Sequence, residues 1–279
     1  MDAVTVSVVI PTLNEAENLP YVLPRVPPQV AEVLIVDGNS TDDTVRVAKE
    51  VLPRARILYQ QGRGKGAALR TGITMATGDI VVLLDADGSC DPAEIPAFVG
   101  ALLAGAHFAK GTRFLQGAGT ADMPAYRRLG NWGLVVLTNV LFRTRFSDIT
   151  YGYNAIWREH ASALALEIDG WAQEIVSNIR VARNGLSAVE VASFEHARLA
   201  GQAKLQTVSA GWAILKAILA VRLRPSRRWR PVLGALGAPA AAGWPREPLA
   251  ALPVLPAALS SKLSGRLQPQ PRLSGGVAR

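Results

Sequence analysis

Asp85 and Asp87 are the two residues whose type and spacing suggest chemistry most directly. They are one residue apart and follow the apolar run 80–84, so in an extended chain both carboxylates project from the same side. Two converging anions repel unless a cation lies between them, and an all-oxygen ligand set suits Mg²⁺ or Mn²⁺. Because these ions usually complete their shell with substrate phosphates, the pair predicts a metal site and a diphosphate substrate. The simpler alternative is a solvated acidic turn.

A strand must position this pair, and an uninterrupted apolar run is typical of a strand buried on both faces of a parallel sheet. Similar runs occupy residues 4–10, 31–36 and 56–59, and helical patterns begin near Glu15 and cover residues 45–51 and 67–76. This alternation predicts an α/β fold, a Rossmann-like and mainly parallel sheet with helices on both faces. Ligands of such sheets bind at the carboxyl ends of the strands, where the two acids lie.

Two further segments are expected near that edge. Asp37 ends the second strand, where it would accept hydrogen bonds from a ribose or a base, or would only cap a helix. The glycine-rich residues 62–66 contain Arg63 and Lys65 and would either close over a nucleotide or form a basic surface loop. The first strand lacks the glycine fingerprint of dinucleotide-binding folds, which argues against NAD as the ligand.

Composition limits the class of partner. The chain has 279 residues, a formal charge of +8 and a pI near 10.1, so an anionic partner is expected: nucleic acid, a phosphorylated substrate or an acidic membrane face. A single cysteine excludes an intrachain disulfide and fits a reducing compartment. The first residues read as a strand, and no secretory signal is visible.

Four segments, in this order, resemble the signature of the family 2 inverting glycosyltransferases with the GT-A fold: VVIPTLNEAENL, IVDGNSTDDT, GRGKGAALRTGI and TGDIVVLLDADGSCDPAEIP. Later segments resemble the polyprenyl-phosphate and dolichyl-phosphate sugar synthases, including the mannose synthases, of that family: KGTRF, YRRLGN, DITYGYNA and EVASFEHARLAGQAKL. The resemblance covers roughly residues 4 to 210, and the order and spacing of its motifs make it specific.

The resemblance implies a role for each matching residue. The donor, a nucleotide-diphosphate sugar of the GDP-mannose or UDP-glucose class, would be bound by Pro11, Thr12, Asn14, Glu15, Asp37, Asn39, Lys65, Asp85, Ala86 and Asp87. Mg²⁺ or Mn²⁺ would be held by Asp85 and Asp87, and the catalytic set would be completed by Arg198 and Lys204, which close over the donor diphosphate. The acceptor phosphate would be held by Arg113, Arg127 and Asn131.

The chain also departs from the family pattern. Members often carry a second acid at the position of Gly38, a glutamine or similar group at Ser89, and serines at Asn131 and Ala203, so the donor base, the sugar and the acceptor stay open. Guanidinium groups present rigid forks to phosphate, so the arginines at 113, 127 and 128 independently predict a phosphate clamp. The alternative is that they serve only surface solubility.

Three regions are expected. Residues 1–204 would be the GT-A catalytic domain, residues 205–230 a basic amphipathic helix on an anionic membrane surface, and residues 231–279 a mostly disordered tail rich in Pro and Ala. The helix is predicted from helical spacing of the apolar residues Val208, Trp212, Leu215 and Leu219. It is too short and too interrupted to span a bilayer, and an ordinary helix packed on the domain is the alternative.

The first functional hypothesis is a metal-dependent inverting hexosyltransferase that acts on a polyprenyl (dolichyl-type) phosphate at the cytoplasmic face of the membrane, with a small membrane partner left open and no nucleic acid. A phosphate acceptor is already an anion and needs no strong base. The alternative is transfer to a hydroxyl of a soluble metabolite or glycan, with Asp148 or Glu174 as the base. A nucleotidyltransferase and a nucleic-acid binder are two other classes, and the latter leaves Asp85 and Asp87 unexplained.

Overall fold

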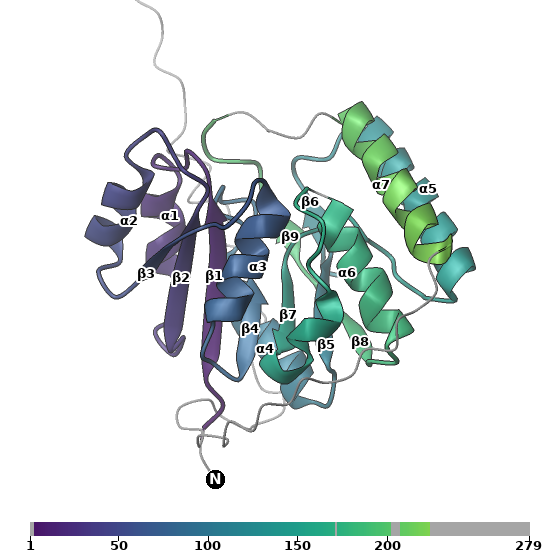
Figure 1. The fold of residues 1–279 in the computed structure, drawn as a ribbon, viewed down its shortest axis with the longest axis horizontal. Coiled ribbons are helices and arrows are strands. Elements are labelled where there is room, and N and C mark those ends of the chain that lie inside the picture. Colours follow the sequence, from purple (N-terminus) through teal and green to yellow (C-terminus); the bar gives the residue numbers. More distant parts are fainter. Residues whose placement is uncertain (1–2, 171, 202–206, 224–279) are drawn as a thin grey trace, which may run out of the picture. The chain divides into compact units, whose positions relative to one another are not determined.

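Within the residues that the structure describes, 3–170, 172–201 and 207–223, a seven-stranded sheet forms the centre of the computed structural model (Figure 1). The strand order is β3-β2-β1-β4-β7-β5-β8. These strands are β1 (Val6–Thr12), β2 (Glu32–Asp37), β3 (Arg56–Tyr59), β4 (Ile80–Leu83), β5 (Phe108–Thr112), β7 (Asn154–Trp157) and β8 (Ala188–Ala192). A separate parallel pair is formed by β6 (Gly119–Thr120) and β9 (Phe194–Glu195).

The mainly parallel sheet predicted from the sequence is confirmed. β1 pairs in parallel with β2 and β4, β2 pairs in parallel with β3, and β5 pairs in parallel with β8. β7 was not predicted, and it runs antiparallel between β4 and β5. This insertion extends the sheet beyond β4, so the residues after β4 lie in the middle of the edge rather than at its end.

Helices connect the strands and cover both faces of the sheet. They are α1 (Leu19–Val22), α2 (Thr44–Val51), α3 (Lys65–Met75), α4 (Ile95–Leu103), α5 (Ala125–Phe142), α6 (Ala172–Arg183) and α7 (Thr207–Leu223), with 3₁₀ turns η1 (Leu23–Arg25), η2 (Pro92–Glu94) and η3 (Arg158–Leu164). The first helix begins at Leu19, not near Glu15 as predicted. Asn14 takes a left-handed conformation, with φ of 52°, and its Oδ1 accepts a hydrogen bond from the main-chain N–H of Thr41.

Alternate residues of β1 point to opposite faces of the sheet and anchor two apolar layers. Val8 and Ile10 are fully buried in the layer formed with α1, η1 and α4. Val9 is buried on the other face, where it packs in one cluster with Ile73 of α3 and Val181 of α6. The sheet is therefore fixed from both sides, which holds its carboxyl edge in place.

A third apolar cluster joins α5, α6 and α7, and Figure 1 shows α5 and α7 side by side. On α7 the buried residues are Ile214, Ile218 and Val221, whereas Trp212 and Leu219 of the predicted stripe are exposed. Because α7 is apolar on most of its sides, its periodicity did not identify the packing face. Among the described helices, none is long and apolar enough to cross a membrane.

The carboxyl ends of three parallel strands meet at one edge. Thr12 of β1 lies in register with Asp37 of β2, and the main-chain N–H of Leu84, just after β4, donates to the carbonyl of Val9. This edge is the one at which the sequence predicts ligand binding. The residues that follow β1, β2 and β4 thus surround one place in the fold.

Candidate active site

Asp85 and Asp87 lie in the short turn that follows β4, and both line two neighbouring pockets. One pocket extends toward β1 and the glycine-rich segment, with Pro11, Thr12 and Lys65 in its wall. The other extends toward α5, α6 and α7. The acid pair therefore faces a cavity on each side, so one ligand can reach it from each pocket.

Lys65, at the start of α3, links two of the acids in this site. Its Nζ lies 2.5 Å from Oδ1 of Asp85 and 2.5 Å from Oε1 of Glu174 on α6. The side chains of Lys65 and Glu174 are about nine-tenths buried, so water screens this arrangement weakly. Glu174 was predicted as a base, as a residue that orders the site or as a helix-surface charge, and its position beside Lys65 makes it part of the charge balance around Asp85.

Glycines let the segment that carries Lys65 reach this position. A Cβ on Gly64 would lie 2.4 Å from the main-chain oxygen of Asp169, and one on Gly66 would lie 2.0 Å from that of Ile168. No real Cβ contact is that short, so only glycine permits the approach of the two backbones. The segment therefore packs against residues 168–170 and directs Lys65 toward the acids.

Arg198 reaches the second acid from a loop that follows β9. Its Nη2 donates to Oδ2 of Asp87 at 2.8 Å, and its Nη1 contacts both carboxylate oxygens of Glu15 at 3.3 and 3.4 Å. The main-chain N–H of Leu199 also donates to the carbonyl of Asp87. The loop thus lies directly on the acidic turn.

These contacts define a cluster with a negative balance. Four carboxylates, Asp85, Asp87, Glu15 and Glu174, are paired with two cations, Lys65 and Arg198, so these six described groups together carry two net negative charges. Burial raises the pKa of Asp85 to about 6; Lys65 opposes this rise, and the charges of Glu174 and Asp87 add to it. The net negative charge of the cluster favours the binding of a further cation.

A divalent ion fits the donor set of this cluster. Its charge would match the two unbalanced negative charges, and carboxylate oxygens suit Mg²⁺ or Mn²⁺. Within the described residues, no group of three or more His, Cys, Asp or Glu side chains is arranged to hold a metal ion by itself. The fit is therefore to an ion that takes one or two ligands from Asp85 and Asp87 and the rest from a bound diphosphate.

The pocket on the β1 side contains most of the predicted donor residues: Pro11, Thr12, Glu15, Lys65, Asp85, Ala86 and Asp87. Asn14, Asp37 and Asn39 are not in its wall. Asp37 is buried beside Thr12, and its carboxylate accepts bonds from the main-chain N–H and the hydroxyl of Ser40. Its observed contacts are thus those of a turn-stabilising residue. The predicted alternative, a helix cap, is not found, because α2 begins at Thr44 with Asp43 as its N-cap.

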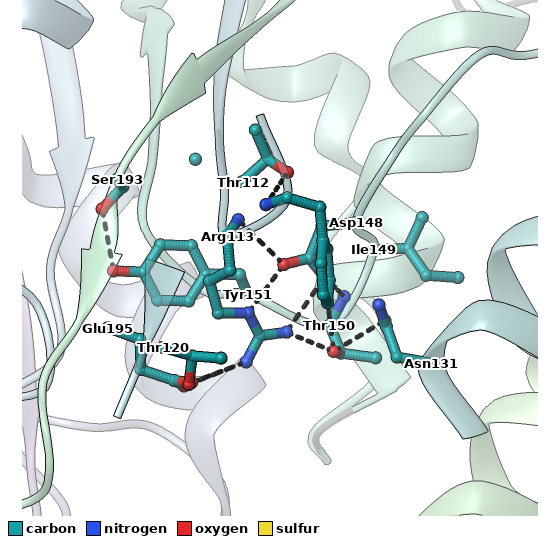
Figure 2. A network of polar contacts seen from close by, with 12 residues as sticks. Thr112, Arg113, Thr120, Asn131, Asp148, Ile149, Thr150, Tyr151, Ser193 and Glu195 are labelled. Carbon is teal, nitrogen blue, oxygen red and sulfur yellow. Dashed lines mark hydrogen bonds and ion pairs between the residues drawn. The ribbon is translucent and has the colours of Figure 1, made fainter. Parts of the chain in front are cut away.

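The pocket on the α5 side contains all three predicted acceptor residues, Arg113, Arg127 and Asn131. Figure 2 shows the network around Arg113, whose guanidinium donates to both oxygens of Asp148, both oxygens of Glu195 and the hydroxyl of Thr150. The Thr150 hydroxyl in turn lies 2.9 Å from Oδ1 of Asn131. All three guanidinium nitrogens therefore have protein acceptors, and a phosphate would have to compete with them.

Asp148 is held as an anion by this network. Although burial acts in the opposite direction, hydrogen bonds from Arg113 and the charges of Lys110 and Arg113 hold the pKa of Asp148 below its ordinary value. A carboxylate stabilised in this way is a weak proton acceptor. The arrangement argues against Asp148 as the general base that an alcohol acceptor would need.

α5 and α7 both expose large apolar side chains. α5 exposes Tyr126, Leu129, Trp132, Val136 and Val140 at intervals of three or four residues, and α7 exposes Trp212, Leu219 and Leu223. We call these eight residues the apolar face. The basic residues Arg128, Lys216 and Arg222 are exposed on the same two helices, and Tyr126 also lines the α5-side pocket.

Sequence reasoning missed Thr150, Gly152 and Glu195, which line the α5-side pocket. Their only signal was their place within the motif segments DITYGYNA and EVASFEHARLAGQAKL. The predicted catalytic Lys204 and the tail 231–279 lie outside the described residues, as do residues 205–206 and 224–230 of the predicted amphipathic helix. These predictions are not tested by the structure.

Comparison with known proteins adds the family. The model described as Glycosyl transferase family 2 matches residues 7–162. Polyprenol monophosphomannose synthase of Mycolicibacterium smegmatis is 33% identical over 198 residues, which cover 66% of this chain and 74% of that protein. Undecaprenyl-phosphate mannosyltransferase of Micrococcus luteus is 29% identical over 243 residues, which cover 82% of this chain and 98% of that protein.

A solved structure agrees in fold. Glucosyl-3-phosphoglycerate synthase from Mycobacterium tuberculosis, in complex with Mn²⁺, uridine diphosphate and phosphoglyceric acid, superposes with a TM-score of 0.62 at 25% identity, over 80% of each chain. The order of the motifs, the acid pair at the carboxyl edge and these likenesses agree. The chain belongs to glycosyltransferase family 2 and is a glycosyltransferase with the GT-A fold.

Proposed function

We propose that this glycosyltransferase moves a hexose from a nucleotide-diphosphate sugar to a polyprenyl phosphate, with inversion at the sugar and with Mg²⁺ or Mn²⁺ as cofactor. The observation that carries the proposal is the chemistry of the α5-side pocket. Its lining combines Asp85, Asp87 and Arg127 with Leu134, Ile214 and other apolar residues of the three-helix cluster. An acceptor with an anionic head and a long apolar tail matches both kinds of lining.

The donor would occupy the β1-side pocket with its diphosphate at the acid pair. A divalent ion held by Asp85 and Asp87 would draw negative charge from the leaving diphosphate. Arg198 would add a second positive charge there, exchanging its present bond to Asp87 for one to the diphosphate. The relatives support this class of donor, since the synthase from M. tuberculosis was solved with uridine-diphosphate-glucose and Mn²⁺.

In the proposed reaction an oxygen of the acceptor phosphate attacks the anomeric carbon of the sugar. The bond from that carbon to the diphosphate oxygen breaks, and its electron pair leaves with the nucleoside diphosphate. No proton has to be removed from the attacking oxygen, because a phosphate oxygen is already charged. This agrees with the site, where the two candidate bases, Asp148 and Glu174, are both engaged in ion pairs.

Arg127 and Asn131 are the residues we assign to the acceptor phosphate. Both line the α5-side pocket, and no ion pair of Arg127 occurs in the described part of the chain. Arg113 stands behind them and would contact the phosphate only by giving up Glu195, Asp148 or Thr150. Its first role in the proposal is to hold the wall of the pocket.

The apolar face would rest on a membrane, which is where a polyprenyl phosphate is found. A peripheral surface of this kind combines apolar side chains, which enter the acyl boundary, with basic ones, which attract anionic lipids. Both α5 and α7 meet this description, and the pocket extends between them. The proposed surface thus includes α5 as well as α7, the described part of the predicted segment 205–230.

The test is an incubation with radiolabelled donor and undecaprenyl phosphate in detergent, followed by extraction into an organic solvent. The proposal predicts label in the organic phase, dependent on Mn²⁺ or Mg²⁺. Label that stays in the aqueous phase with a new product would instead favour a soluble acceptor. That second function has one specific support, the likeness to a synthase solved with phosphoglyceric acid, and 3-phosphoglycerate is the matching acceptor to include.

A further inference from the structure

Lys110 is a charged residue near one edge of the sheet, and its one role described above is to help keep Asp148 ionised. It lies in β5, its exposed fraction is 0%, and it follows the buried residues Phe108 and Ala109. An ammonium group without water is unfavourable unless the protein supplies polar partners. The polar partners of the Lys110 ammonium group therefore indicate the role of this residue.

The partners of Lys110 are two main-chain carbonyl groups, one in β5 itself and one in the wall of the α5-side pocket. Its Nζ donates to the oxygen of Gly111 at 3.0 Å and to the oxygen of Tyr151 at 3.1 Å. Tyr151 lies in the loop of residues 147–153, between α5 and β7, which we call the acceptor loop. Lys110 and Tyr151 are 41 residues apart in the sequence, so this hydrogen bond connects the acceptor loop to strand β5.

Glu190 supports the other end of the same loop. Lys110 and Glu190 are direct neighbours across the β5–β8 pair, so their side chains emerge on the same face of the sheet. Oε1 of Glu190 accepts bonds from the main-chain N–H groups of Ser147 at 2.9 Å and Asp148 at 3.3 Å. The pair thus supplies a donor for the loop's carbonyl and an acceptor for its N–H groups.

The acceptor loop carries two residues, Thr150 and Gly152, whose positions relative to the site are tightly limited. Thr150 joins Arg113 to Asn131 through its hydroxyl. Gly152 passes so close to the charge cluster that a Cβ there would lie 2.7 Å from Oε1 of Glu174 and 2.9 Å from Nζ of Lys65. A small movement of this loop would therefore change both the phosphate-binding wall and the space beside Asp85.

We propose that Lys110 and Glu190 are positioning residues for the acceptor: together they hold the acceptor loop so that Thr150 and Gly152 keep their places in the α5-side pocket. The inference rests on the proposed function for the identity of the acceptor. It does not involve the β1-side pocket, whose wall includes no residue of the acceptor loop. The pair should therefore affect the acceptor much more than the donor.

The test compares Lys110→Met, Glu190→Ala and Glu190→Gln with the wild-type protein in steady-state kinetics, with donor and undecaprenyl phosphate varied in turn. Lys110→Met and Glu190→Ala should raise the acceptor KM about tenfold or lower kcat by that factor, because a displaced loop misplaces the reacting groups. The donor KM should change less than about twofold. Glu190→Gln keeps an oxygen for the two N–H groups and should restore most of the loss.

Lys49→Met, on the exposed surface of α2, is the matched control and should behave like the wild type. Equal changes for donor and acceptor, or a Glu190→Gln variant as impaired as Glu190→Ala, would overturn the inference. So would unchanged acceptor kinetics in folded variants. If Lys110→Met does not fold, the two Glu190 variants decide. If the wild-type protein uses 3-phosphoglycerate instead, the polyprenyl phosphate proposal fails, and the same comparison with that acceptor still tests the positioning pair.

Discussion

Arg198 and Asp87 are 111 residues apart in the sequence, yet the arginine Nη2 lies 2.8 Å from Oδ2 of the aspartate. The bond places a cation on one of the two acids to which we assign the metal and the donor diphosphate. Lys65 does the same for Asp85. The site thus balances part of its own charge, and the arriving ion and diphosphate must rearrange these pairs rather than fill an unpaired site.

Arg198→Ala is expected to lower kcat about a hundredfold, because a fixed cation near the leaving diphosphate stabilises charge that develops in the transition state. The measurement is steady-state kcat at saturating donor and acceptor. Arg46→Ala removes an exposed arginine of α2 and serves as the control. An Arg198→Ala enzyme with the control's kcat would remove Arg198 from the catalytic set.

Glu174→Gln is expected to weaken Mn²⁺ binding about tenfold. Without the Glu174 charge, the cluster keeps one net negative charge instead of two, and Lys65 is left to neutralise Asp85. Binding can be followed by the paramagnetic signal of free Mn²⁺, which requires no turnover. Glu50→Gln, on the surface of α2, should leave the affinity unchanged, and an equally unchanged Glu174→Gln would contradict the charge balance.

Mn²⁺ affinity should also fall as the pH is lowered through about 6. Burial raises the pKa of Asp85 to about 6; Lys65 opposes this rise, and the charges of Glu174 and Asp87 add to it. Below that pH a proton occupies the carboxyl and competes with the ion, so affinity should drop by up to about tenfold per pH unit. A Mn²⁺ titration series shows this directly, and constant affinity down to pH 5 would count against Asp85 as a ligand.

The apolar face should govern association with lipid vesicles. A double variant, Leu129→Ser with Trp132→Ser, removes two exposed apolar side chains from α5 and should reduce co-sedimentation with phosphatidylglycerol vesicles about tenfold. Tyr21→Ser, on α1, is equally exposed and makes a matched control. If the double variant and the control co-sediment with vesicles to the same extent, the apolar face does not contact the membrane.

The parts of the fold predicted correctly from the sequence are those in which local pattern and burial coincide. β4 is buried along its whole length, so its apolar run and the acids after it could be recognised directly. β7 lies in the same sheet and is as long as β4, but it begins at the polar Asn154 and keeps an apolar run of only three residues, and β8 has partly exposed residues throughout. Neither pattern differs from that of a loop, so the antiparallel insertion could not be inferred.

The same limit applies to the prediction of the site from the sequence. Its motif residues were predicted, but their partners were not, because Arg113 meets Asp148 after 35 residues and Glu195 after 82. Sequence patterns report neighbours within an element, and these contacts exist only once the sheet has brought distant elements together. For this reason Arg113 was predicted as a free phosphate ligand, and its guanidinium is found bonded within the wall of the pocket.

The most direct test of the account is calorimetric titration of uridine and guanosine diphosphate into the wild-type protein and into Asp87→Asn, each with and without Mn²⁺. The account predicts that one of the two nucleotides binds the wild type at least about tenfold tighter with Mn²⁺, and that Asp87→Asn, folded by circular dichroism, loses this gain. Mn²⁺-dependent binding that survives in Asp87→Asn would contradict it.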